Sequence, residues 1–127
     1  MAEFLSIEFF EAAKDALESD TELQDAAHGV SLNVQFLVTD GPDGDIAYGF
    51  EIAKGVVDVV VGDLEQPSVT ITNDYRTAVE ISSGRVNTQT AFIKGQLRID
   101  GDRAALLRNQ ELIQKFSAAM SRVDVTY

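Results

Sequence analysis

The sequence predicts an α+β domain, with a five-stranded, mostly antiparallel sheet and helices packed on one face. Three observations carry this prediction. The chain has 127 residues, 45% of them hydrophobic, which suits a single domain over residues 1–127 with one sizeable core. Its middle part alternates apolar and polar residues, as half-buried strands do, and both ends follow the 3.6-residue period of helices. A further alternating segment between the last helical segments supplies the fifth strand.

We expect two helices before the first strand. Ser6 is a suitable N-cap for a helix that runs to about Ser19, because apolar residues recur at helical spacing behind it. A shorter helix is expected from Asp20 to Ala27, where the His28-Gly29 pair would end it.

Three strands are expected to follow as a meander. Turn-forming residues at 40–45 separate an alternating strand at 30–39 from a second one at 46–52. The third strand, residues 56–61, is apolar on both faces apart from Asp58, which is typical of an edge strand protected by one charge. The apolar faces of the first two strands consist of Val30, Leu32, Val34, Phe36 and Val38, and of Ile46, Tyr48, Phe50 and Ile52.

The last third of the chain predicts strand, helix, helical turn, strand and helix. A fourth strand at 68–72 leads to a helix capped by Asn73 or Asp74, which would end near Gly84. Residues 83–101 then give a helical turn and a fifth strand. Asp102 is expected to cap one long helix running to about Met120. One stripe of that helix contains Leu106, Asn109, Ile113, Phe116 and Met120.

The formal charge of −11 is distributed unevenly. Residues 1–75 carry sixteen acidic and two basic side chains, whereas residues 76–127 carry eight basic and five acidic ones. So acidic a chain is not expected to bind nucleic acid or to dock firmly on anionic lipid. No apolar run approaches the ~20 residues that span a bilayer, so no stable membrane insertion is expected. The absence of cysteine leaves the redox compartment open. The N-terminus lacks the pattern of a signal peptide, so a cytoplasmic location is the default expectation.

Catalytic and metal-binding patterns are nearly absent. His28 is the single histidine, and its place at a helix end favours an interaction with the helix dipole over base catalysis. Glu51 lies at the twelfth position counted from Asp40, but Pro42 and Gly44 stand where a calcium loop needs oxygen ligands. A hairpin turn is therefore expected there. We expect no metal and no cofactor.

Apolar side chains from distant segments are expected to meet in the interior. Phe36, Tyr48 and Phe50 would project from the sheet toward the last helix. From the residues alone, this pattern fits both a close-packed core and a ligand cavity. Asn109 and Gln110 lie in or beside the apolar stripe of that helix, and a buried amide without a partner costs ~1–3 kcal/mol. A ligand, a backbone carbonyl or water could each supply the partner.

A series of different short motifs lies between residues 69 and 116. They are Val69-Thr70-Ile71-Thr72, Gly84, Asn87-Thr88-Gln89, Ala91-Phe92, Gly95, Leu97-Arg98-Ile99, Gly101-Asp102 and Gln110. In this order the motifs resemble those of the sterol carrier protein family, type two, the small non-specific lipid-transfer domains. Thr88 replaces the family's proline, and Asn109 stands where an apolar residue is commoner, which suggests a more polar pocket. The missing peroxisomal tail suggests a free-standing, bacterial version.

The resemblance implies that sheet and helices enclose an apolar tunnel for fatty acids, acyl-CoA, sterols or similar lipids. The last helix would form one wall, and the protein would carry its ligand without making or breaking a bond. Gln110, with Asn109 as a second candidate, would meet the polar end of the ligand. The candidate ligand-binding residues are Phe36, Tyr48, Phe50, Val79, Phe92, Leu106, Asn109, Gln110, Ile113 and Phe116.

Two other functions remain open at this point. An isomerase or cyclase would need a carboxylate such as Asp58 or Glu80 pointing into the cavity. An accessory module would instead deliver substrate to a protein partner, or form a homodimer through the edge strand.

Overall fold

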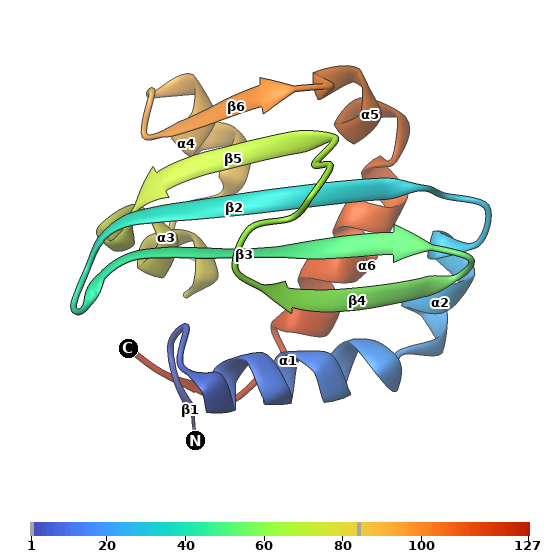
Figure 1. Cartoon of the computed structure of the whole chain (residues 1–127), viewed down its shortest axis with the longest axis horizontal. Helices are drawn as coiled ribbons and strands as arrows, with labels where there is room; N and C mark the ends of the chain where they lie inside the picture. Colours follow the sequence, from blue (N-terminus) through green and yellow to red (C-terminus); the bar gives the residue numbers. More distant parts are fainter. Residues whose placement is uncertain (1, 84) are drawn as a thin grey trace.

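A five-stranded sheet and a layer of helices make up the described part of the chain, residues 2–83 and 85–127 of a computed structural model (Figure 1). Of residues 88 and 89, the backbone alone is described. The sheet has the order β4-β3-β2-β5-β6, with β2 and β5 parallel and all other neighbours antiparallel. The predicted five-stranded, mostly antiparallel sheet is thus confirmed, and its one parallel pair makes it a mixed sheet. Strand β4 lies at an edge, as expected. Its strands are β2 (Leu32–Gly41), β3 (Gly44–Ala53), β4 (Val56–Val61), β5 (Val69–Asp74) and β6 (Leu97–Gly101).

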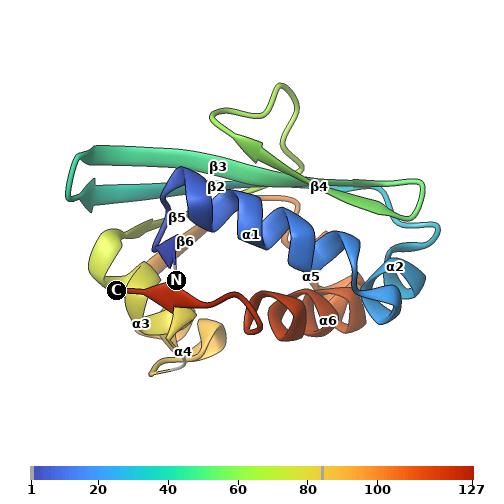
Figure 2. The same cartoon turned by 90° about the horizontal axis from the view of Figure 1, so that it is seen from below.

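The helices cover one face of the sheet, as Figure 2 shows. Each predicted N-cap is confirmed: Ser6, Asp74 and Asp102 accept a hydrogen bond from the backbone N–H three residues later, at 3.2, 2.8 and 3.1 Å. The predicted helix end at Gly84 lies outside the described residues. No helix in the described ranges combines the length and apolar character needed to cross a bilayer. The helices are α1 (Ile7–Glu18), α2 (Thr21–Ala27), α3 (Tyr75–Ser82), α4 (Thr88–Ile93), α5 (Arg103–Arg108) and α6 (Gln110–Met120).

The prediction of one long C-terminal helix is wrong, because the helix is interrupted at Asn109 between α5 and α6. Asn109 has φ −117° and ψ 33°, outside the helical region. Its side-chain Nδ2 donates to the Ala105 carbonyl at 2.7 Å. In a continuous helix, the Asn109 backbone N–H would use that carbonyl; here it bonds to the Leu106 carbonyl at 3.3 Å. The asparagine amide thus competes successfully with the helix backbone.

The pairing register of the strands aligns their apolar faces, which together form one continuous floor. Phe36 of β2 pairs with Tyr48 of β3 and with Ile71 of β5, and Ile71 pairs with Ile99 of β6. Paired residues lie on the same face of a sheet. Four strands therefore present apolar side chains together toward the helices.

The opposite face of the sheet is crossed by the β4–β5 connection, residues 62–68, which lies above the sheet in Figure 2. Gln35 fixes this segment, since its buried side chain accepts from the Leu64 N–H at 2.6 Å and donates to the Gly62 carbonyl at 3.3 Å. Gly49 permits the close approach, because a Cβ there would lie 2.5 Å from the Val34 carbonyl oxygen and 3.0 Å from Leu64 Cδ1. The connection therefore covers the middle of this face around Gln35, where none of the described helices packs.

The two ends of the described chain meet in a short parallel ladder that the sequence analysis did not predict. It joins β1 (Ala2–Glu3) to β7 (Val125–Thr126). The ring of Phe4, directly after β1, lies 5.3 Å from Tyr127 and 5.8 Å from Tyr75, centroid to centroid. This aromatic contact anchors both termini against α3.

Candidate ligand-binding cavity

An apolar cavity of about 500 Å³ lies between the inner face of the sheet and the C-terminal helices. Small-molecule sites commonly have volumes of this size. Its floor comes from the strands: Leu32, Val34, Phe36, Phe50, Ile52, Ile71 and Ile99. Its wall comes from α4, α5 and α6: Phe92, Arg103, Leu106, Leu107, Gln110, Leu112, Ile113, Gln114 and Phe116.

The cavity opens between α4 and the α5–α6 pair. Floor residues are buried or half-buried, and Leu32 is only 2% exposed. On the helical side, Phe92 of α4 is 40% exposed and Leu107 of α5 is 69% exposed. The polar lining residues, Arg103, Gln110 and Gln114, are exposed as well. The hollow is therefore apolar and buried at the sheet, and more polar and exposed at the helices.

Aromatic rings separate the cavity from a second core cluster beneath α1 and α3. Tyr48 stacks on the cavity residue Phe36, with 5.0 Å between ring centroids and 8° between ring planes. On its other side it lies 5.2 Å from Phe10, which belongs to the second cluster. Phe50 meets Phe116 edge-on at 4.4 Å, joining floor to wall. Burial raises the pKa of the Tyr48 phenol, because desolvation disfavours the charged phenolate.

Seven of the ten predicted ligand-binding residues line this cavity: Phe36, Phe50, Phe92, Leu106, Gln110, Ile113 and Phe116. The structure places Tyr48, Val79 and Asn109 elsewhere. Tyr48 lies behind Phe36, and Val79 packs on the second core cluster. Asn109 uses its amide to interrupt the helix. For all ten, contact with a ligand stays a prediction.

Most of the lining residues that the sequence analysis missed lie on strands. Leu32, Val34 and Ile52 share the alternating faces that already contained Phe36 and Phe50, so extending that alternation to every strand would have found them. The same reasoning applies to Ile71. Arg103 had no such signal, because nothing in the local pattern distinguishes it from a solvated surface arginine.

The carboxylates considered for catalysis lie away from the cavity. Asp58 is exposed on β4, opposite Glu51 of β3. Glu80 pairs with Arg76 on the surface of α3, with Nε 3.3 Å from Oε1. Within the described residues, no charged group other than Arg103 lines the hollow. This arrangement suits binding of an apolar molecule.

The segment considered for calcium binding begins at residues 40–45. The residues in question form the predicted hairpin turn between β2 and β3, where the Asp40 backbone N–H bonds to Asp45 Oδ1 at 3.2 Å. No group of three or more potential metal ligands occurs among the residues that the structure describes.

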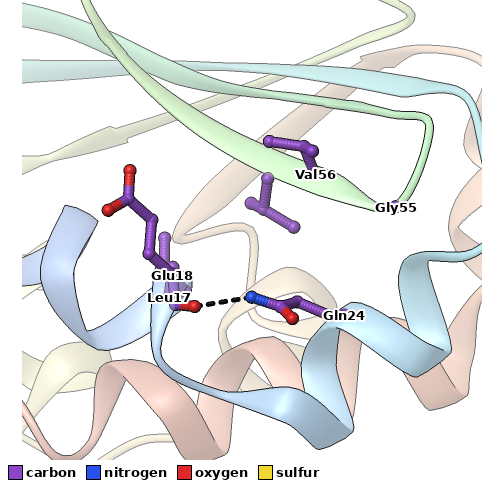
Figure 3. Close-up of a pocket in the computed structure, with 6 residues that line it drawn as sticks. Leu17, Glu18, Gln24, Gly55 and Val56 are labelled. Atoms are coloured by element: carbon purple, nitrogen blue, oxygen red, sulfur yellow. Dashed lines mark hydrogen bonds between the residues drawn. The ribbon is translucent and has the colours of Figure 1, made fainter.

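A second hollow of about 200 Å³ lies between α1, α2 and the β3–β4 turn (Figure 3). Glu18 and Gln24 face it, and the Gln24 side chain donates to the Glu18 backbone carbonyl. Its volume is below the range usual for ligand sites. It shares no lining residue with the larger cavity, which is the better candidate site.

The sheet, the helical wall and the open apolar hollow together define a small α+β domain with a cavity suited to an apolar molecule. A comparison with protein families identifies it further: the SCP-2 sterol transfer family matches residues 10–114. The chain belongs to this family, as the sequence motifs suggested.

Two curated relatives match parts of the chain. Sterol carrier protein 2 from Gallus gallus is 30% identical over 78 residues, which are 61% of this chain and 14% of that protein. Peroxisomal multifunctional enzyme A from Dictyostelium discoideum is 35% identical over 69 residues, which are 54% of this chain and 16% of that protein. The matches therefore span only a small part of each relative.

Solved structures show the same fold over nearly the whole chain. A crystal structure of sterol carrier protein 2 superposes with a TM-score of 0.79 at 19% identity, covering 96% of this chain and all of that one (100%). A conserved hypothetical protein of Thermus thermophilus, described as possibly a sterol carrier protein, gives 0.78 at 19% identity and covers 99% and 93%. At such identities, the likeness establishes the fold alone.

Proposed function

We propose that this protein is a non-enzymatic carrier that binds lipids by their apolar part in the cavity between the sheet and α6. The apolar hollow of about 500 Å³, open at one side, is the observation that carries the proposal. Membership of a sterol transfer family supports it. Fatty acids, acyl-CoA and sterols are the ligand classes to examine.

Affinity would come from partition of the chain into the hollow. A methylene occupies about as much space as a water molecule, ~30 Å³, so the cavity has room for on the order of fifteen such groups. Each buried methylene contributes ~0.8 kcal/mol, or about 10 kcal/mol for a chain of roughly twelve carbons. Association costs at least ~4 kcal/mol. The difference is at most ~6 kcal/mol, which corresponds to a dissociation constant of tens of micromolar or higher, weak enough for exchange.

Displacement of a fluorescent fatty-acid probe by unlabelled lipids tests this proposal. Ile113→Trp should fill part of the hollow and weaken probe binding, because Ile113 is a half-buried wall residue of α6. Ile7→Trp is the matched control, since Ile7 is a helical isoleucine on α1 that is 74% exposed. We expect the control to bind like the unmodified protein. Failure of every lipid to displace the probe, or equal binding by both variants, would refute the proposal.

A second candidate is a carrier domain that delivers its lipid to an enzyme. The match to a segment of a peroxisomal multifunctional enzyme favours it. Both candidates use the same cavity. They differ in whether the protein co-purifies with an enzyme partner, which size-exclusion chromatography with mass spectrometry of the purified complex would show.

A further inference from the structure

Arg103 occupies a distinctive place at the opening of the cavity. It is the first residue of α5 and the single charged residue among the described residues that line the hollow. The rest of the lining is apolar except for Gln110 and Gln114, which lie one helical turn apart on α6. One positive charge therefore stands where the apolar interior meets solvent.

The surroundings of Arg103 orient its guanidinium without neutralising it. Nε donates to the Ile99 backbone carbonyl at 3.0 Å, and the guanidinium carbon lies 5.6 Å from the centre of the Phe92 ring. Within the described residues, no carboxylate oxygen lies within 4.0 Å of its nitrogens. The terminal Nη groups are thus available to an incoming anion.

The carboxylates close to Arg103 in the sequence form ion pairs with other arginines. Asp102 caps α5 and lies 3.4 Å from Arg108 Nη2, and Asp100 lies 2.9 Å from Arg98 Nε. Five basic residues in this half of the chain have a carboxylate partner, unlike Arg103: Arg76, Arg98, Arg108, Lys115 and Arg122.

From this geometry we infer that Arg103 forms an anion subsite, and that the cavity selects single-chain amphiphiles with a negatively charged head group. This inference rests on the proposed lipid-carrier function. The chain would enter the apolar hollow while the head group stays at the opening against the guanidinium. A planar guanidinium pairs with carboxylate or phosphate through two parallel hydrogen bonds, which a neutral hydroxyl cannot match. The side-chain amides of Gln110 and Gln114 add donors on the same wall.

The test compares three ligands that share one chain: dodecanoate, dodecyl phosphate and dodecanol. Dissociation constants would be measured by calorimetry at low ionic strength for the unmodified protein, Arg103→Gln and Arg98→Gln. Arg98→Gln removes the same charge from an exposed side chain of β6 that does not line the cavity. We expect Arg103→Gln to weaken binding of an anionic ligand about two- to fivefold, as for an exposed charge pair. Binding of dodecanol should not change, and Arg98→Gln should leave all three ligands unaffected.

The outcomes separate this inference from the carrier function itself. A loss confined to dodecanoate or to dodecyl phosphate supports the subsite and shows which head group it takes. Equal loss for all three ligands in Arg103→Gln, or loss for none, overturns the subsite while dodecanol binding still supports the carrier. If the unmodified protein binds none of the three, the carrier function itself is refuted.

Discussion

Replacing Gln35 by leucine should destabilise the protein without changing its affinity for lipids. Gln35 is 4% exposed and lies on the face of the sheet opposite the cavity. Its amide nitrogen reaches the carbonyls of Phe36, Tyr48 and Gly62 at 3.2, 3.0 and 3.3 Å, and its oxygen accepts from the Leu64 N–H at 2.6 Å. Leucine has a similar volume but no polar atom.

The expected size follows from the groups left without partners. The Leu64 N–H belongs to a residue that is 8% exposed, so losing its acceptor should cost ~1–3 kcal/mol, and the weaker bond to Gly62 about 1 kcal/mol more. The total is about 2–4 kcal/mol. With an unfolding entropy of ~2.1 cal/mol/K per residue, a chain of this length loses about 4 °C in Tm per kcal/mol. We therefore expect Tm to fall by roughly 8–15 °C.

Urea unfolding and thermal unfolding at neutral pH would measure this loss, and probe binding at low temperature would measure lipid affinity. Gln35→Glu sharpens the experiment. A buried carboxylate has a raised pKa, so this variant should be least stable at neutral pH and recover as pH falls and the group protonates. A loss below about 0.5 kcal/mol for Gln35→Leu would refute the reasoning, because a change in stability that small is usual for surface residues without a structural role.

Two further predictions concern the helices. Asn109→Ala should increase helicity at 222 nm and leave stability unchanged or raised by about 0.5 kcal/mol, because the backbone N–H can then bond to the Ala105 carbonyl; unchanged circular dichroism would contradict this. Side-chain and backbone hydrogen bonds from Thr77 hold the pKa of the Asp74 carboxyl below its usual 3.8. The carboxylate therefore stabilises the fold fully above pH 3.8, and this stabilisation is lost as pH falls through the lowered pKa. Asp74→Ala should therefore cost about 1 kcal/mol at neutral pH and little in strong acid, whereas Asp74→Asn, which keeps a cap, should not show this dependence; a loss independent of pH in the alanine variant would argue against it.

The sequence predicted those features that depend on local rules. Alternation located the floor strands, and short polar side chains located the caps at Ser6, Asp74 and Asp102. The β1–β7 ladder was missed because two-residue strands carry no periodic signal and are defined by a partner at the other end of the chain. Asn109 was misjudged for a different reason. Whether an asparagine amide bonds outward or back to its own helix depends on packing that local propensity does not describe.

The size of the hollow argues that it is more than imperfect packing. Where core side chains are truncated, the cost of an unfilled cavity is ~24 cal/mol per Å³. Applied to about 500 Å³, that rate would amount to roughly 12 kcal/mol, which is comparable to the whole stability of an ordinary domain. The fold avoids most of this cost because the hollow opens to solvent past Phe92 and Leu107 instead of being sealed. Burial of an apolar chain against the floor is still favourable, so a bound ligand adds stability that grows with the logarithm of its free concentration divided by its Kd.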